Sequence, residues 1–262
     1  MDAAILPLGK KEARPEAVKF KLTDYAKLSK LPKAPRSFGH LALQKQPWGD
    51  LGNSQRGCCF WAGSAHETMG WAAEAGKVVP FSTANVLADY AEQTGFDPSQ
   101  DDPKGNNLTD QGTDMKDGAS YRRRVGIVDA NGERHKIDAY LGLKVGSVSQ
   151  LLLATYLFGF VGFGCRFPRS AFAQFDKGQI WKPVARSPLA GAHYMPCGAF
   201  NGVNFRMITW GKEVRVSPAW VEEYMDEAIV AISLERLTNN RSLDGFDIGG
   251  LRESLAGLSQ AA

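Results

Sequence analysis

The stretch that starts at residue 52 reads Gly52-Asn53-Ser54-Gln55-Arg56-Gly57-Cys58-Cys59-Phe60-Trp61-Ala62. Glycine and polar residues come first and are typical of a loop, whereas the apolar residues that follow recur at helical spacing. A helix is therefore expected to begin near Cys58 and to end near Gly76. Its first turn would hold Cys59 beside unpaired backbone N–H groups and the positive end of the helix dipole. Both features favour thiolate over thiol, so the stretch predicts a reactive cysteine.

Two amide side chains in this loop are candidates for stabilising a negative oxygen beside Cys59. Asn53 lies six residues upstream, and its amide could form an oxyanion hole together with a backbone N–H of the first helical turn. Gln55 is the alternative. Cys58 directly precedes Cys59, and successive helical residues point about 100° apart, so only one of the two can face a cleft. The offset from Asn53 favours Cys59.

The composition of the 262-residue chain is that of an ordinary globular protein, with 44% hydrophobic and 23% charged residues. The net charge of +3 is small and argues against a specific nucleic-acid partner. No signal peptide is expected, because the apolar stretch 5–8 is too short. The longest apolar run, 151–164, is too short and too interrupted to span a membrane. Four cysteines do not make a disulfide framework here, so a reducing compartment is expected.

The pattern along the chain predicts three regions, which are a basic extended N-terminal arm at 1–47, a folded domain at 48–237 and a C-terminal tail at 238–262. The arm is rich in lysine, arginine and proline, and a solvated leader is the simplest expectation for it. Helices are expected mainly in the first half of the domain and strands in the second, which indicates an α+β protein with two lobes. The expected helices are 23–29, 58–76, 82–95, 113–124, 148–157, a short one from 217 and 251–258. The expected strands are 125–128 and 134–140 around Asn131-Gly132, then 160–167, 193–200, 204–209 and 227–233.

The cysteine segment resembles the active-site segment of papain-like cysteine peptidases, in which an amide residue stands six positions before a cysteine that opens the central helix. Gly191-Ala192-His193 is similar to the glycine–histidine strand of that family, and Thr209-Trp210-Gly211 to its tryptophan–glycine pair. The resemblance implies a papain-like two-lobed α+β fold, with a helical lobe and an antiparallel β-sheet or barrel lobe. It also implies Cys59 as nucleophile, His193 as general base and acid and Asn53 in the oxyanion hole. Gly191 and Trp210 would border the substrate.

A subgroup found in tailed bacteriophages and prophages resembles the chain more closely, over roughly 48–237. Three further stretches carry that likeness, Ala62-Gly63-Ser64-Ala65-His66, Thr109-Asp110-Gln111-Gly112-Thr113-Asp114 and Tyr224-Met225-Asp226-Glu227-Ala228. Members of this subgroup are usually described as peptidases or as uncharacterised phage proteins. The resemblance therefore implies the fold more firmly than the substrate.

One departure concerns the residue that orients the histidine. The family carries an asparagine two residues before the tryptophan, and Ile208 stands at that position here. The orienting residue is then Thr209, Asn201 or absent. A weak orienting residue costs rate without abolishing catalysis.

Other residues with chemical potential have simpler explanations. His66 is expected to pack or hydrogen-bond, His40 and His135 to be exposed, and Cys165 and Cys197 to lie in the core. Asp110 and Asp114 could bind Ca²⁺ with Asp101 and Asp102, but helix capping explains Asp114 more simply. A zinc site from Cys58, Cys59, His66 and His193 has no supporting spacing. We expect neither a metal nor a cofactor.

The leading hypothesis is a cysteine peptidase or amidase that works through an acyl-enzyme and acts on a peptide or protein. Its rival is a structural head or tail protein of a phage that keeps the fold without useful turnover and docks its arm on phage structural proteins. A third possibility is that residues 1–47 occupy the cleft as an inhibitory propeptide would. The expected location is the cytoplasm of a bacterial host or the virion, without a membrane partner.

Overall fold

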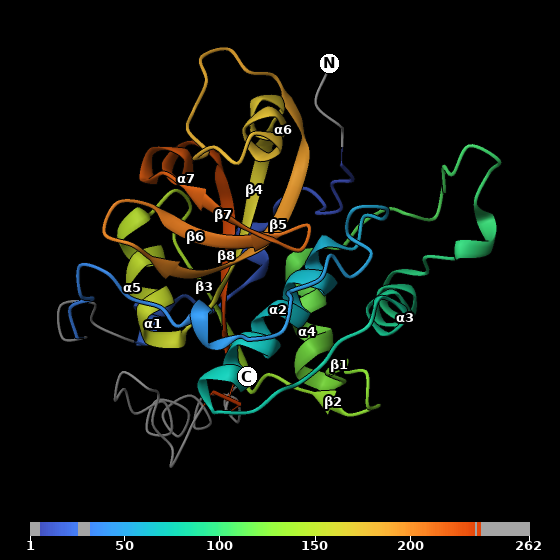
Figure 1. Cartoon of the computed structure of the whole chain (residues 1–262), viewed down its shortest axis with the longest axis horizontal. Coiled ribbons are helices and arrows are strands. Elements are labelled where there is room, and N and C mark those ends of the chain that lie inside the picture. Colours follow the sequence, from blue (N-terminus) through green and yellow to red (C-terminus); the bar gives the residue numbers. More distant parts are fainter. Residues whose placement is uncertain (1–5, 26–31, 234, 237–262) are drawn as a thin grey trace.

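The computed structural model describes residues 6–25, 32–233 and 235–236. Helices gather on one side of the molecule and a curved sheet on the other, and the helix labelled α2 (Cys59–Glu74) lies between them (Figure 1). This is the α+β arrangement that the sequence predicted.

The helical side is built on α2, which is buried along nearly its whole length. Around it lie α3 (Thr83–Thr94), α4 (Met115–Arg124) and a small antiparallel pair, β1 (Ile127–Val128) with β2 (Arg134–His135). The caps explain where two of these helices begin. The Ser82 side chain accepts the Asn85 N–H, and the Asp114 side chain accepts the Asp117 N–H.

The sheet side is six-stranded, wholly antiparallel and ordered β3-β8-β4-β5-β6-β7. Three helices and short turns cover it. The strands are β3 (Ala139–Gly142), β4 (Val161–Pro168), β5 (Leu189–Phe200), β6 (Phe205–Thr209), β7 (Lys212–Val216) and β8 (Met225–Ile232). The helices on this side are α5 (Val148–Phe158), α6 (Arg169–Asp176) and α7 (Pro218–Tyr224). The remaining short elements of the described chain are α1 (Leu22–Tyr25) and the 3₁₀ turns η1 (Pro15–Ala17), η3 (Leu41–Leu43) and η4 (Pro98–Gln100), of which η4 lies in the loop after α3.

Close contact between the two sides depends on small residues of α2. A Cβ at Gly63 would lie 2.5 Å from the Tyr194 ring, and one at Gly70 would lie 2.2 Å from the Phe160 ring. Tyr194 belongs to β5, so α2 packs its backbone directly against the strand that carries His193.

Most predicted elements are present, one predicted strand needs correction and two elements were missed. The expected strand 134–140 is split, because Ala139–Gly142 pairs with β8 in the large sheet instead of continuing the hairpin. Helix α6 and strand β7 were not predicted. Of the expected helix 23–29, the structure describes only the part within Leu22–Tyr25. The predicted tail 238–262 and its helix 251–258 lie outside the described residues.

The N-terminal arm is not a solvated leader in its described part. Residues 6–14, called the strap below, run between the two sides of the molecule. Lys10 N–H donates to Ala192 O at 3.2 Å, while Lys11 N–H donates to Thr113 O at 3.0 Å and Thr113 N–H to Gly9 O at 2.7 Å. Gly9 and Lys10 are buried as a result. Farther along the arm, Phe38 exchanges two backbone hydrogen bonds with Phe200. The arm therefore docks on its own chain.

No helix among the described residues is both long enough and apolar enough to cross a membrane.

Candidate active site

Cys59 is the first residue of α2 and is fully buried. The preceding residue, Cys58, caps the helix without a side-chain hydrogen bond. Directly before this cap, Gly57 N–H donates to both carboxylate oxygens of Asp110, at 3.1 and 3.0 Å. The helix start is thus held in place by a loop from elsewhere in the chain, as the predicted reactive position requires.

The protonation state of Cys59 differs from the expectation. Burial raises the pKa of its thiol from 9.0 to about 11, although the backbone N–H groups of Tyr194 and Gly9 and the charge of Lys10 act in the opposite direction. Gly9 and Lys10 belong to the strap, so the same segment that covers the sulfur also hydrogen-bonds it. The helix dipole lowers the pKa of Cys59 less than desolvation raises it, so Cys59 is a neutral thiol in this structure.

His193 lies on β5 and is fully buried. The next residue along the strand, Tyr194, gives its backbone N–H to the Cys59 sulfur, which brings the imidazole-bearing strand against the start of α2. The Nε2 atom of His193 lies 2.6 Å from Thr209 Oγ1, and its Nδ1 atom has no hydrogen-bond partner among the described residues. Burial lowers the pKa of His193 to about 3, so the imidazole is neutral as well.

Trp210 covers the imidazole. Its ring stacks on that of His193 with centroids 4.5 Å apart and an interplanar angle of 19°. Trp210 holds a left-handed backbone with φ 46°, and the following Gly211 bridges to Gly49 in the loop that leads to Cys59. The predicted tryptophan–glycine pair therefore shields the imidazole and joins the two candidate segments.

Of the two residues proposed to orient His193, Thr209 is the one in contact with its ring. Asn201 sits in the exposed turn between β5 and β6, where its Oδ1 accepts the N–H groups of Val203 and Asn204. Ile208 is fully buried in another cluster, because neighbouring strand residues face opposite sides. Thr209 in the orienting role remains a prediction that this contact supports.

Asn53 and Gln55 differ sharply in their placement. The Asn53 side chain is buried, and its Oδ1 atom has no hydrogen-bond partner among the described residues, whereas Gln55 is exposed. A short turn closed by Asn53 N–H to Asp50 O, at 3.0 Å, carries the amide inward. Asn53 is therefore the better placed of the two for an oxyanion hole.

The Thr109–Asp114 block packs against the start of α2. Asp110 holds Gly57 and also accepts the Tyr90 hydroxyl, while Thr113 accepts the Trp61 indole N–H at 2.9 Å and pairs with the strap. Asp114 caps α4, as expected. The sequence indicated the cap at Asp114 but not the contacts of Asp110 and Thr113, which hold the helix start.

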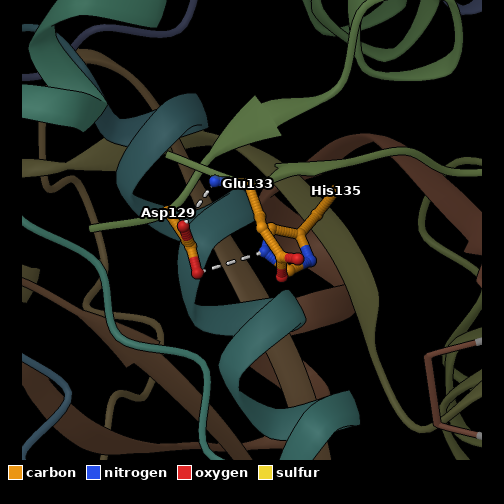
Figure 2. Close-up of side chains that lie close together, drawn as sticks. All are labelled: Asp129, Glu133 and His135. Carbon is orange, nitrogen blue, oxygen red and sulfur yellow. Dashed lines mark hydrogen bonds and ion pairs between the residues drawn. The ribbon is translucent and has the colours of Figure 1, made fainter. Parts of the chain in front are cut away.

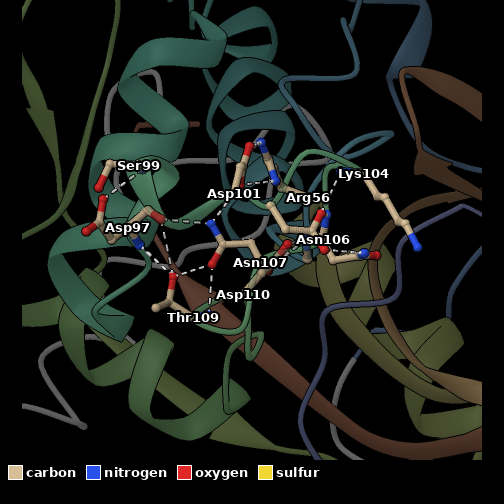
Figure 3. Close-up of polar contacts among 11 residues, drawn as sticks. Arg56, Asp97, Ser99, Asp101, Lys104, Asn106, Asn107, Thr109 and Asp110 are labelled. Carbon is tan, nitrogen blue, oxygen red and sulfur yellow. Dashed lines mark hydrogen bonds and ion pairs between the residues drawn. The ribbon is translucent and has the colours of Figure 1, made fainter.

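The loop before this block does not assemble the suggested calcium site (Figure 3). Asp101 pairs with Arg56 and accepts the Asn107 amide, and the Asp102 side chain accepts hydrogen bonds from Asn106 and from Lys104 N–H. Asp110 and Asp114 are engaged elsewhere, as described above. Hydrogen bonds within the loop account for its aspartates, and among the described residues the four carboxylates do not gather around one point.

The structure does bring Asp129, Glu133 and His135 together at the β1–β2 hairpin (Figure 2). His135 was expected to be exposed and is not, since its Nδ1 lies 2.6 Å from Glu235 Oε1 and its Nε2 lies 3.6 Å from Asp129 Oδ2. Burial alone would lower the pKa of His135, but the two carboxylates outweigh it and raise the pKa above 6.5. An ion-paired imidazolium explains this cluster without a metal.

The predictions for His66, Cys165 and Cys197 agree with the structure, whereas His40 is half-buried rather than exposed. His66 Nε2 hydrogen-bonds the carbonyl oxygens of Trp48 and Gly49 at 3.1 and 2.9 Å, which makes it a structural histidine. Cys165 and Cys197 are fully buried thiols. A Cβ at Gly191 would lie 3.0 Å from a Leu8 methyl, so this glycine borders the strap.

Cys59 opens a buried helix that packs against the antiparallel sheet carrying His193. The chain has the fold of the papain-like cysteine proteases. Xylellain, a cysteine protease from Xylella fastidiosa, aligns with a TM-score of 0.63 and 12% identity over 89% of this chain and 98% of that chain. Procathepsin B S9 from Trypanosoma congolense gives a TM-score of 0.59 and 12% identity, over 87% and 86%. Procathepsin L 3 from the larval midgut of Tenebrio molitor gives 0.52 and 14%, over 82% and 76%.

At these identities the similarity establishes the fold alone. No protein-family model matches the sequence, and no curated protein matches it.

Proposed function

We propose that the protein is a cysteine peptidase or amidase, and that the structure describes its latent form. The observation that carries the proposal is the environment of His193. Thr209 and Trp210 hold its ring, and the strand that bears it also gives a backbone N–H to the Cys59 sulfur. A merely structural histidine does not need a tryptophan shield, a hydroxyl on one ring nitrogen and a second ring nitrogen without a partner among the described residues.

The reaction follows from these placements. Cys59 Sγ attacks the carbonyl carbon of the substrate while His193 takes the thiol proton, giving a tetrahedral oxyanion held by the Asn53 amide and backbone N–H groups of the helix start. The C–N bond then breaks, and His193 returns the proton to the leaving amine. Water adds to the remaining thioester with His193 as base, and the C–S bond breaks to release the acid and restore the thiol.

Thr209 takes the place of the family's asparagine in this scheme. Its hydroxyl fixes Nε2, which leaves Nδ1 as the nitrogen that exchanges the proton. Trp210 keeps water from competing for that contact. A neutral hydroxyl contributes orientation without charge, so the scheme predicts a competent but moderate catalyst.

Latency follows from the strap. Gly9 lies against the helix start so closely that a Cβ there would meet Gly57 O at 1.7 Å, and Lys10 pairs with Ala192 beside His193. A substrate carbonyl has no room to reach Cys59 until the strap leaves. Several similar solved structures are proforms, among them procathepsin B S9 and the Amb a 11 cysteine protease in its proform. That likeness supports an inhibitory role for the strap.

An epoxide-type thiol inhibitor tests the proposal on the full chain. With Gly9→Ala used to displace the strap, the inhibitor should modify Cys59 selectively, and a fluorogenic peptide mixture should be hydrolysed. Cys59→Ala should abolish both signals, whereas the matched variant Cys58→Ala should keep them. Selective labelling of Cys58, or hydrolysis that survives Cys59→Ala, would overturn the assignment.

The rival is a structural phage protein without turnover, and the replacement of the orienting asparagine by Ile208 favours it. The docked arm weighs against it, because Phe38 and the strap already bind their own chain. A phage or prophage origin, phage structural partners and a location in the host cytoplasm or the virion rest on the sequence resemblance. Mass spectrometry of purified particles from a producing host would detect the chain if it is a virion component.

A further inference from the structure

The side chain of Lys10 fills a pocket that ends in two carboxylates. The side chain is 0% exposed, and its Nζ lies 3.0 Å from Asp226 Oδ2 and 2.9 Å from Glu227 Oε1. Nζ also donates to Lys11 O at 3.1 Å. Lysine is almost never fully buried unless it is paired, so this site is built around the cation.

A bulge in β8 brings the two carboxylates to one point. Neighbouring strand residues normally face opposite sides, so Asp226 and Glu227 should point apart. Here Gly164 pairs with Glu227 and the next residue, Cys165, pairs with Met225, which leaves Asp226 as an extra residue in β8. The bulge turns both carboxylates toward the Lys10 ammonium.

The walls of the pocket fit a long unbranched side chain. A Cβ at Gly164 would lie 2.5 Å from Lys10 Cε and 2.5 Å from Met115 Sδ, so glycine at this position leaves the space that the methylene chain uses. Met115 is fully buried beside it. The pocket thus offers an apolar channel with an acidic end.

The charge of the pocket decides what can occupy it. With the strap in place, the Asp226 and Glu227 side chains are 12% and 5% exposed, so an uncharged side chain at the position of Lys10 would leave two adjacent, mostly buried carboxylates without a cation. Leaving one half of a buried ion pair is strongly unfavourable. Asp226 Oδ1 is buried and has no hydrogen-bond partner among the described residues, so the planar fork of an arginine could use it as a further acceptor.

The pocket lies one residue away from the reactive sulfur. Gly9 gives its backbone N–H to Cys59, and Lys10 follows directly. Gly9 has no room for a side chain, because a Cβ there would lie 1.7 Å from Gly57 O and 2.1 Å from Gly57 C. A peptide that replaces the strap therefore needs glycine at the position of Gly9 and a side chain that fits the acidic pocket at the position of Lys10.

We propose that this is the specificity pocket of the active site, and that the opened protein takes peptides with lysine or arginine in the position of Lys10, next to glycine. The strap is then an internal copy of the preferred ligand. The inference rests on the proposed function for turnover, but its recognition step can be measured without catalysis.

The first test uses the strap itself in the full chain, with alkylation of Cys59 by iodoacetamide as the measure of opening. Lys10→Arg should stay as protected as the original chain, whereas Lys10→Met and Lys10→Glu should raise the rate at least about tenfold. Lys11→Met, on an exposed residue of the same strap, is the control and should change nothing. Lys10→Glu combined with Glu227→Lys should restore protection. Equal rates for Lys10→Met and the original chain would overturn the assignment.

The second test measures peptides in trans. The full chain with Gly9→Ala and Cys59→Ser should bind a labelled Pro-Leu-Gly-Lys-Lys-Glu peptide, read by fluorescence anisotropy. The same peptide with arginine at its fourth position should bind similarly, and that with methionine at least about tenfold more weakly. Asp226→Asn with Glu227→Gln should remove the difference. If Gly9→Ala leaves the strap closed, Lys10→Glu provides a second opened chain for the same measurement.

The outcomes separate this inference from the proposed function. One outcome is that the chain prefers basic peptides in binding, while the chain that keeps Cys59 hydrolyses none of them. This outcome would contradict the peptidase proposal and support the pocket. Hydrolysis of peptides irrespective of a basic residue would sink the pocket and leave the peptidase intact. Equal binding of the lysine and methionine peptides also overturns the pocket.

Discussion

A methyl group added at Gly9 should expose Cys59. The added Cβ would lie 1.7 Å from Gly57 O and 2.1 Å from Gly57 C, both backbone atoms. Gly57 cannot yield easily, because its N–H is held by the Asp110 carboxylate at 3.1 and 3.0 Å. The strap is the side that has to move, so Gly9→Ala should lift it from the helix start.

The expected gain in thiol reactivity follows from the pKa of Cys59. Burial raises that pKa from 9.0 to about 11, which lowers the thiolate fraction at pH 7 by about 100-fold. Lifting the strap readmits water and relieves the desolvation that causes the shift. The alkylation rate at pH 7 should therefore rise by up to about 100-fold, and the pH at which the rate is half-maximal should fall by about two units.

The assay is alkylation of Cys59 by iodoacetamide across pH 6 to about 11, followed by mass spectrometry of the modified peptide. Lys11→Ala, on an exposed strap residue, is the control and should follow the original chain. Far-UV circular dichroism should show that Gly9→Ala keeps its fold. A folded Gly9→Ala chain with an unchanged pH profile would refute the view that the strap controls this thiol.

Three further predictions concern the site and its support. Thr209→Val should lower kcat/KM of the opened chain by up to about 100-fold through loss of ring orientation, with Thr209→Ser largely restoring it; equal rates for Val and Thr would contradict the orienting role. Arg122→Leu should reduce the free energy of unfolding in urea by about 3 to 5 kcal/mol, because it strands the buried Glu67 carboxylate, and a loss no larger than that of the exposed Arg123→Leu would contradict this. The raised pKa of His135 should stabilise the fold fully below its unfolded pKa of about 6.5 and lose that effect as pH rises through the folded value, so His135→Phe should flatten the urea stability profile between pH 6 and about 8. A variant profile as steep as the original would show that another group titrates.

The local parts of the site could be predicted from the sequence. The loop-to-helix change around Cys59, the apolar strand that ends near Phe200 and the cap at Asp114 each depend on neighbouring residues, and the structure contains all three. Thr209 could be named as one of two candidates because it directly precedes the tryptophan. The choice between Thr209 and Asn201 needed the fold of the strand pair.

The long-range parts could not be predicted. Lys10 is one of many basic residues in a polar arm, and its partner Asp226 is 216 positions away. Only a bulge that depends on the pairing with Cys165 makes Asp226 and Glu227 converge. The predicted thiolate at Cys59 was wrong for the same reason. The helix dipole is a local property that the sequence reveals, whereas the burial of the sulfur by the strap depends on the fold.

The ion pair between Lys10 and Asp226 also determines when the strap can be anchored as the chain is synthesised. The strap leaves the ribosome long before β8 (Met225–Ile232), and β8 lies between β3 and β4 in the sheet and pairs with both. The sheet that carries His193 is completed only when β8 enters it, and that step also delivers the carboxylates that anchor Lys10. A newly made molecule therefore completes its sheet and anchors the strap over Cys59 in the same step.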